Sequence, residues 1–512
     1  MLWSVLLAIF CLAPDPAFSA EPSIKRPNVL FIAVDDLNDW VGFLGGYPGR
    51  VHTPNIDRLA KRGVAFANAH CASPVCCPSR TAVLTGLMPH TSGIYNNGQW
   101  WRPHHPAIVT IPMHFKADGY AVVGAGKIFH HTAGSNPPDQ WDEFQRLVFH
   151  DDPWFRDHKL NYPWSKAAPF PTGFPFSKVP ELPHENDWGA IPQKTEDDYD
   201  DARTVDFAIR QLQRDQGKPF FIACGLFRPH LPWYAPKKYF DLYPLHSVQL
   251  PIVKPMDLND VPKEGKDLAK ARRSDFEKIK NADRYRHAVQ AYLASISFAD
   301  AQVGRLMRAL DASPHATNTI IVFWSDHGWH HGQKEHWHKS TLWEEATRVP
   351  LIVAAPGMAS NGASCAQPVS LVDIYPTLIE LCGLKSRSNL DGLSLVPQLR
   401  NPAAPRNRPA VTVFKPGQAS VRTLTHRYTR YSDGSEELYD HRSDPNEWSN
   451  RARRRESRSI IADLSRWLPA DWAHPAPKKS AYEFDPKDYS WTRKADGTRT
   501  HGSASNDRMN RR

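Results

Sequence analysis

The sequence has few cysteines and lacks both an N-glycosylation sequon and a nucleic-acid-reading motif. Seven cysteines among 512 residues cannot form a disulfide scaffold, so one or two bridges at most are expected. No Asn-x-Ser or Asn-x-Thr occurs, which favours a bacterial over a lysosomal setting. Without a recognisable reading motif, nucleic acid is not an expected partner.

Long apolar runs are also absent beyond the N-terminus. Leu2 to Ala13 is apolar but too short to span a bilayer comfortably, and small residues follow at Ala17, Ser19 and Ala20. We therefore expect residues 1–20 to be a signal peptide and the mature protein to be exported, periplasmic or secreted, without stable membrane insertion. An uncleaved anchor is the alternative, because the segment before the apolar run lacks Lys and Arg.

The remaining chain is globular in composition, with 41% hydrophobic and 23% charged residues. Its formal net charge is +9, and an exported basic protein favours polyanionic substrates such as sulfated polysaccharides.

Buried strands alternate with helices along residues 21–402. Continuous apolar runs predict strands at 28–34, 120–124, 219–225, 319–324 and 351–354. Helical spacing and end signals predict helices at 54–61, 200–212, 284–310 and 371–381. This order predicts an α/β domain with a large, mostly parallel sheet flanked by helices.

The pattern changes after residue 402. Short strand-like pieces and one helix predict a small antiparallel α+β subdomain over residues 403–473. Residues 474–512 are polar and basic without periodicity, and we expect a loosely held tail. Residues 133–197 and 245–275 are expected to be irregular insertions.

One stretch, Cys76-Cys77-Pro78-Ser79-Arg80-Thr81-Ala82-Val83-Leu84-Thr85-Gly86, predicts a tight turn that continues into a helix. Pro78 suits an early helical position and Gly86 a helix end. Cys76 would then lie at the helix N-terminus, which favours an anion, and Arg80 could reach the same anion one turn later. The alternative is that Cys76 is only a small buried hydrophobic residue.

Polar residues follow the predicted strands. Asp35, Asp36 and Asp326 supply carboxylates that suit a hard divalent cation, with His327 beside them. Each pair alone could be ordinary turn residues.

The other candidates are Lys127, His130, His230 and Lys339. Lys127 and His130, three residues apart, could instead be a solvated surface pair. His331, His336 and His338 raise the possibility of zinc, which the acidic ligand set disfavours.

Cys76-x-Pro78-Ser79-Arg80 followed by Leu84-Thr85-Gly86 resembles the signature of the type I sulfatases. The resemblance covers about residues 26–450 and implies an alkaline-phosphatase-like fold. Within the family, the segments around Lys127 and from 325 to 339 are most similar to the iduronate-2-sulfatase branch and its bacterial relatives. A maturation enzyme of that family oxidises the motif cysteine, here Cys76, to formylglycine, whose hydrate offers one hydroxyl to attack sulfur and one to expel sulfate.

The resemblance also implies the ligands and roles of the site. One Ca²⁺ would be held by Asp35, Asp36, Asp326, His327 and the modified Cys76. Arg80, Lys127 and Lys339 would stabilise the sulfuryl oxygens, Asp326 could accept a proton, His230 or Lys339 would protonate the leaving alcohol, and His130 would deprotonate the second hydroxyl.

The predicted function is therefore calcium-dependent hydrolysis of sulfate esters on a sulfated sugar. Two alternatives remain at this point. A phosphomonoester or phosphonate ester hydrolase of the same superfamily would act on a group of similar shape. A secreted polyanion-binding protein would carry a decayed site. The sugar itself is not predicted.

Overall fold

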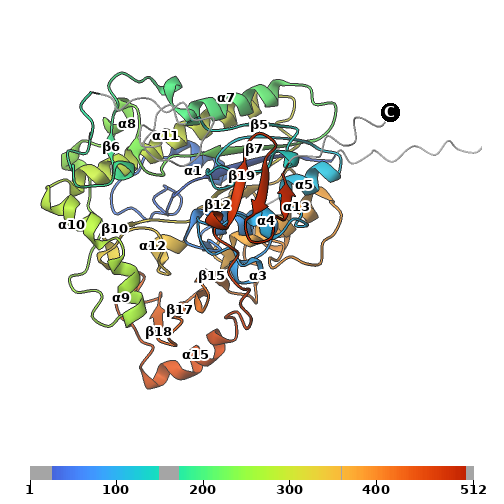
Figure 1. Ribbon diagram of the computed structural model, residues 1–512. Helices are drawn as coiled ribbons and strands as arrows, with labels where there is room; N and C mark the ends of the chain where they lie inside the picture. Colours follow the sequence, from blue (N-terminus) through green and yellow to red (C-terminus); the bar gives the residue numbers. More distant parts are fainter. Residues whose placement is uncertain (1–25, 149–171, 359, 503–512) are drawn as a thin grey trace, which may run out of the picture.

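The computed structural model describes residues 26–148, 172–358 and 360–502, so the predicted signal peptide lies outside the described residues. Its centre is an eight-stranded sheet (Figure 1). In spatial order the strands are β13 (Ser364–Cys365), β2 (Val64–Phe66), β12 (Leu351–Ala354), β9 (Thr319–Ser325), β1 (Asn28–Val34), β7 (Phe220–Leu226), β4 (Ala121–Gly126) and β5 (Glu143–Gln145).

Most neighbouring strands of this sheet are parallel, as predicted. β1 pairs in parallel with β7 and with β9, and β4 pairs in parallel with β7 and β5. Only β12 runs antiparallel to both of its neighbours, β9 and β2. The carboxyl ends of β1, β4, β7 and β9 therefore meet at one edge of the sheet.

Helices cover both faces of the sheet because alternate side chains of its strands enter two separate cores. Leu30 and Ile32 of β1 belong to the core with α1 (Pro54–Arg62), α7 (Asp200–Gln213) and α11 (Tyr285–Asp311). Phe31 of β1 belongs to the core with α2 (Cys76–Thr85), α5 (Ile111–Ala117) and α13 (Ile374–Cys382). Figure 1 shows α7 and α11 together on one side of the sheet. The α/β prediction is confirmed.

A second, antiparallel sheet follows in the chain. It consists of β15 (Ala410–Lys415), β16 (Gln418–Arg422), β17 (His426–Arg430) and β18 (Glu436–Asp440), with α15 (Arg458–Ser465) after it. These elements confirm the predicted C-terminal sheet and helix, whereas the domain boundary at residue 402 stays a prediction. Figure 1 shows this part below the main sheet.

The expected loosely held tail is wrong for its described part. β19 (Tyr482–Asp485), β20 (Ser490–Arg493) and β21 (Arg499–His501) form a three-stranded antiparallel sheet. Its stabilising side chains are aromatic: Tyr482, Tyr489 and Trp491 form one buried cluster with Trp100. A few large aromatic residues thus order a segment whose average composition is polar.

The two expected irregular insertions also contain regular elements. The first contributes the edge strand β5, and the second contains α9 (Lys263–Lys270). β5 is only three residues long and mostly polar, so it carries no period that could predict it. Residues 149–171 of the first insertion lie outside the described residues.

The six cysteines in the described ranges are all buried and free. Among the helices of the described residues, none combines the length and apolarity that a membrane crossing requires.

We predict that Trp491→Ala destabilises the sheet β19–β21. Trp491 is 0% exposed, and removing a buried tryptophan costs about 3–5 kcal/mol. Hydrogen exchange should show faster amide exchange in residues 476–502. Trp467→Ala is the matched control, because Trp467 is 42% exposed and should leave exchange there unchanged. Unchanged protection in Trp491→Ala would contradict the packing described.

Candidate active site

The main sheet gathers the predicted polar residues at one edge. Asp35 and Asp36 follow β1, Lys127 follows β4, His230 lies shortly after β7, and Asp326 follows β9. Ligand sites of such sheets lie at the carboxyl ends of the strands. Asp36 has φ 58°, a left-handed conformation that is uncommon outside glycine and typical of functional turns.

Helix α2 carries Cys76 into this site as its first residue. The preceding Val75 is extended, and Gly86, with φ 73°, ends the helix. All ten residues of α2 are buried, so the helix N-terminus points into the interior rather than into bulk solvent. The predicted turn and helix are confirmed.

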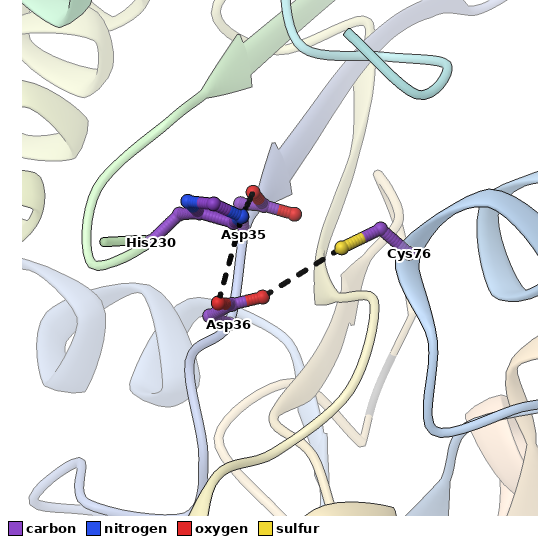
Figure 2. A group of neighbouring side chains, drawn as sticks. All are labelled: Asp35, Asp36, Cys76 and His230. Carbon is purple, nitrogen blue, oxygen red and sulfur yellow. Dashed lines mark hydrogen bonds and ion pairs between the residues drawn. The ribbon is translucent and has the colours of Figure 1, made fainter. Parts of the chain in front are cut away.

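The sulfur of Cys76 lies among charged and polar groups. Its Sγ is 3.1 Å from Nζ of Lys339, 3.2 Å from Nε2 of His327, 3.8 Å from Oδ1 of Asp36 and 4.0 Å from Nζ of Lys127. Figure 2 shows the Asp36 carboxylate between Cys76 and the His230 ring. Nε2 of His230 is 3.9 Å from carboxylate oxygens of both Asp35 and Asp36.

Arg80 holds the carboxylates rather than facing a ligand. Its Nε donates to Asp326 Oδ2 at 2.8 Å, and Nη2 donates to Asp35 Oδ1 at 2.9 Å. The other bonds go to backbone carbonyls of Val34, Lys127 and Ile128. The five N–H groups of the guanidinium match these five bonds. In this arrangement the guanidinium has no N–H group left for an anion, and the expected contact of Arg80 with the anion stays a prediction.

The two lysines pair with different carboxylates. Lys127 donates to Asp35, and Lys339 Nζ donates to Asp36 Oδ1 at 2.6 Å. Burial alone would raise the pKa of Asp35, but Lys127 and Arg80 outweigh it and hold that pKa below its usual range. Burial lowers the pKa of Lys339, yet Asp36 and the other anionic groups raise it overall, so this ammonium stays charged.

Asp36 has a carboxylate oxygen that receives no hydrogen bond from the protein. Its Oδ2 is buried and has no hydrogen-bond partner, although each such oxygen normally has one. Burial raises its pKa to about 7; Lys339 opposes this shift, whereas Asp35 and Asp326 add to it. Burial also lowers the pKa of His327 to about 4, so its imidazole is neutral and able to bind a metal.

These residues fit a divalent cation. Ligand atoms of Asp36, Cys76, Asp326 and His327 lie within 4.8 Å of one another, as do those of Asp35, Asp36, Cys76 and His230. Three carboxylates suit Ca²⁺, while the imidazole of His327 is a less common ligand for it. A third group, Glu344, His441 and Glu447, is compensated by Arg427, which donates to both glutamates.

The histidines considered for zinc do not form a site. Both ring nitrogens of His336 bond backbone carbonyls, of Ala269 and Lys339. His331 stacks on Trp40 with ring centroids 4.4 Å apart. Within the described ranges, none of His331, His336 and His338 belongs to a group that could hold a metal.

His130 lies in the loop after β4, three residues beyond Lys127. Its Nδ1 is 2.9 Å from Oγ1 of Thr132, and burial, together with His131, Lys479, Lys127 and Lys339, lowers its pKa well below the ordinary value. Sequence reasoning identified neither Thr132 nor Lys479, because neither lies in a motif.

Comparisons with known proteins find sulfatases along most of the chain. The sulfatase family model matches residues 27–384, and the model described as N-sulphoglucosamine sulphohydrolase, C-terminal, matches residues 332–471. A sulfatase of Formosa agariphila is 38% identical and covers 92% of each chain. Iduronate 2-sulfatase of Mus musculus is 32% identical over 75% of this chain and 73% of its own length.

Solved structures share the fold at lower identity. A phosphonate monoester hydrolase from Silicibacter pomeroyi has a TM-score of 0.70 at 21% identity, covering 90% of this chain and 98% of that one. A 2-O GAG sulfatase has a TM-score of 0.64 at 23% identity, covering 87% and 91%. The family match spans most of the chain and includes every residue of the site, and so this chain belongs to the type I sulfatases and is a sulfuric ester hydrolase.

Proposed function

We propose that this enzyme is exported, depends on calcium and hydrolyses sulfate esters of a sulfated sugar through a formylglycine made from Cys76. The observation that carries the proposal is the position of Cys76 Sγ, at the N-terminus of α2 and between Lys339, His327 and Asp36. Relatives named iduronate 2-sulfatase and ulvan-active sulfatase support a sugar substrate.

A cysteine thiol is a poor nucleophile in this environment. Burial raises the pKa of Cys76, and Lys127 and Lys339 only partly oppose that shift. Formylglycine would supply a hydrated aldehyde, a nucleophilic hydroxyl with a second hydroxyl able to regenerate the carbonyl. The residues around position 76 need only orient that group and move its protons.

Lys127 and Lys339 are the cations that can meet the sulfuryl oxygens. Both ammonium groups lie within 4.0 Å of Cys76 Sγ, whereas Arg80 is fully bonded to protein. Preorganised positive charge in a buried site stabilises negative charge that develops during transfer. Arg80 contributes indirectly, by fixing Asp35 and Asp326.

Asp35, Asp36, Asp326 and His327 would hold Ca²⁺. The ion would supply positive charge beside the reacting oxygens and satisfy the unpartnered Oδ2 of Asp36. Both oxygens of Asp326 already accept bonds, from Arg80 and from the backbone N–H groups of Asp36 and His327. Asp326 is therefore a poorer proton acceptor than the sequence led us to expect.

Two histidines carry the proposed proton transfers. Burial and the nearby Lys127 lower the pKa of His230, and burial and His131 lower that of His130, so both rings are neutral at pH 7. His230, beside Asp35 and Asp36, would first take up a proton and then give it to the leaving alcohol, whereas Lys339 is already charged and could donate directly. His130 would take a proton from the group at position 76 when sulfate leaves.

Maturation and export complete the proposal. A formylglycine-generating or other sulfatase-maturating enzyme must oxidise Cys76, and residues 1–20 would direct the chain to the periplasm or the medium. The net charge of +9 suits a sulfated saccharide substrate.

Replacing the two adjacent cysteines should separate the nucleophile from its neighbour. Cys76→Ala should abolish turnover. Cys77→Ala should retain substantial activity, because the Cys77 thiol faces the carbonyl of Gln99 at 3.6 Å rather than the lysines. Initial rates on a sulfated saccharide measure both variants. Equal loss of activity from the two changes would show that position 76 has no special role.

Metal removal should inactivate the enzyme reversibly. After chelation, Ca²⁺ should restore activity better than Zn²⁺, because Asp35, Asp36 and Asp326 make most of the proposed ligands carboxylates. Elemental analysis of the native protein should find one calcium per chain. Full activity in a preparation shown to be metal-free would rule out the proposed cation site.

A paired substrate assay tests the reaction class. The wild-type enzyme should hydrolyse a sulfated saccharide with a higher kcat/KM than the corresponding phosphate monoester or a phosphonate monoester. Cys76→Ala serves as the blank for all three compounds. A preference for the phosphate or phosphonate ester would contradict the sulfated-sugar proposal.

A further inference from the structure

The C-terminal segment 476–502, which carries β19–β21, lies beyond both family matches, which end at residues 384 and 471. It nevertheless contacts two loops beside the active site. The side-chain amide of Gln99 donates to Ala476 O at 2.6 Å, and Lys479 N donates to Gly98 O at 2.7 Å. These bonds fix the loop between α3 (Pro89–Ser92) and α4 (Trp101–His104).

The same segment holds the loop that carries His130. Asn136 N donates to the Tyr489 hydroxyl at 3.2 Å. Gly134 has φ 77°, and a Cβ atom there would lie 2.8 Å from Nε1 of Trp491. The close approach therefore requires glycine at this position. The loop 130–136 is thus packed between the catalytic sheet and the C-terminal segment.

The side chain of Lys479, in this segment, contacts the loop that carries His130. Its Nζ donates to Oγ1 of Thr132 at 2.6 Å and lies 5.6 Å from the Trp100 ring centroid. Within the described ranges, no carboxylate lies within ion-pair distance of it. Lys479 is half-buried, and an ammonium partly removed from water without a carboxylate partner carries a desolvation cost, which points to a role other than stability.

Thr132 connects Lys479 to His130. Its Oγ1 is 2.9 Å from His130 Nδ1 and 2.9 Å from Ser135 Oγ. A hydroxyl offers one proton and two lone pairs, and Lys479 takes one lone pair. The remaining lone pair and the proton serve His130 and Ser135. Nδ1 of His130 is therefore engaged in either arrangement. Its Nε2 makes no hydrogen bond to any described residue, so it remains available to the reaction.

We propose that Lys479 is a positioning residue for His130, acting through Thr132 to fix the orientation and proton distribution of the imidazole. The proposal rests on the proposed role of His130 in releasing sulfate. It makes the C-terminal segment a functional part of the active site. A hydrogen bond at one ring nitrogen commonly decides whether the other ring nitrogen carries a proton.

The influence of Lys479 on His130 can be measured as a change in the pKa of His130. Besides burial, the groups that lower the pKa of His130 are His131, Lys479, Lys127 and Lys339. Removing the Lys479 charge must raise that pKa. The neutral base is then lost at a higher pH, so the acid limb of the rate profile moves towards neutral pH.

The experiment compares Lys479→Met with Lys479→Arg and Lys478→Met. Lys478 is exposed and adjacent in the chain, so its variant is a matched control. Histidine labelled with ¹⁵N reports the pKa and tautomer of His130 by NMR, with the signal assigned from its loss in His130→Asn. Steady-state kinetics on a sulfated saccharide give kcat and KM.

Lys479→Met should lower kcat on the order of 10–100-fold with KM little changed, and should raise the His130 pKa. Lys479→Arg should restore most of kcat, and Lys478→Met should match wild type. Identical kcat and His130 spectra in Lys479→Met and Lys478→Met would overturn the proposal. So would a lower kcat with an unchanged His130 signal, or a raised KM with normal kcat.

The failure of the proposed function would look different. A wild-type enzyme without sulfatase activity would contradict that function. The spectra would then still test whether Lys479 controls the His130 ring, because they require no turnover.

Discussion

Arg80 connects the ends of three strands to the helix that begins at Cys76. From α2 its guanidinium bonds Asp35 after β1, Asp326 after β9 and the Lys127 carbonyl after β4. Arg80, Asp35 and Asp326 are all fully buried, so loss of one partner would leave an uncompensated charge in the interior, at a cost of about 3–5 kcal/mol. The geometry around position 76 depends on this one side chain.

The buried charges of the site are balanced without any ligand. The carboxylates of Asp35, Asp36 and Asp326 face the cations of Arg80, Lys127 and Lys339. A divalent cation would leave the site with net positive charge, which attracts a sulfate ester and stabilises charge on its oxygens. Oδ2 of Asp36 is buried without a hydrogen-bond partner, so the protein groups alone leave the negative charge on this atom uncompensated.

The sequence could predict the elements that bury apolar side chains on both faces. β1, β7 and β9 appear as continuous apolar runs, and the candidate residues follow them directly, so their convergence could be anticipated. Two- and three-residue strands such as β13 and β5 are too short to show a period. The role of Arg80 depends on which acceptors surround it, and the position of Lys479 depends on long-range packing of Trp491; neither has a local signal.

The proposed chemistry depends most on the chemical state of position 76. Burial makes the thiol of Cys76 a weak nucleophile, while the lysines, histidines and carboxylates around it suit a hydrated aldehyde. Mass spectrometry of the proteolytic peptide spanning Cys76 tests this directly in enzyme purified with full activity. We predict formylglycine at position 76 and an unmodified Cys77 in the same peptide. Unmodified cysteine at position 76 in fully active protein would contradict the account.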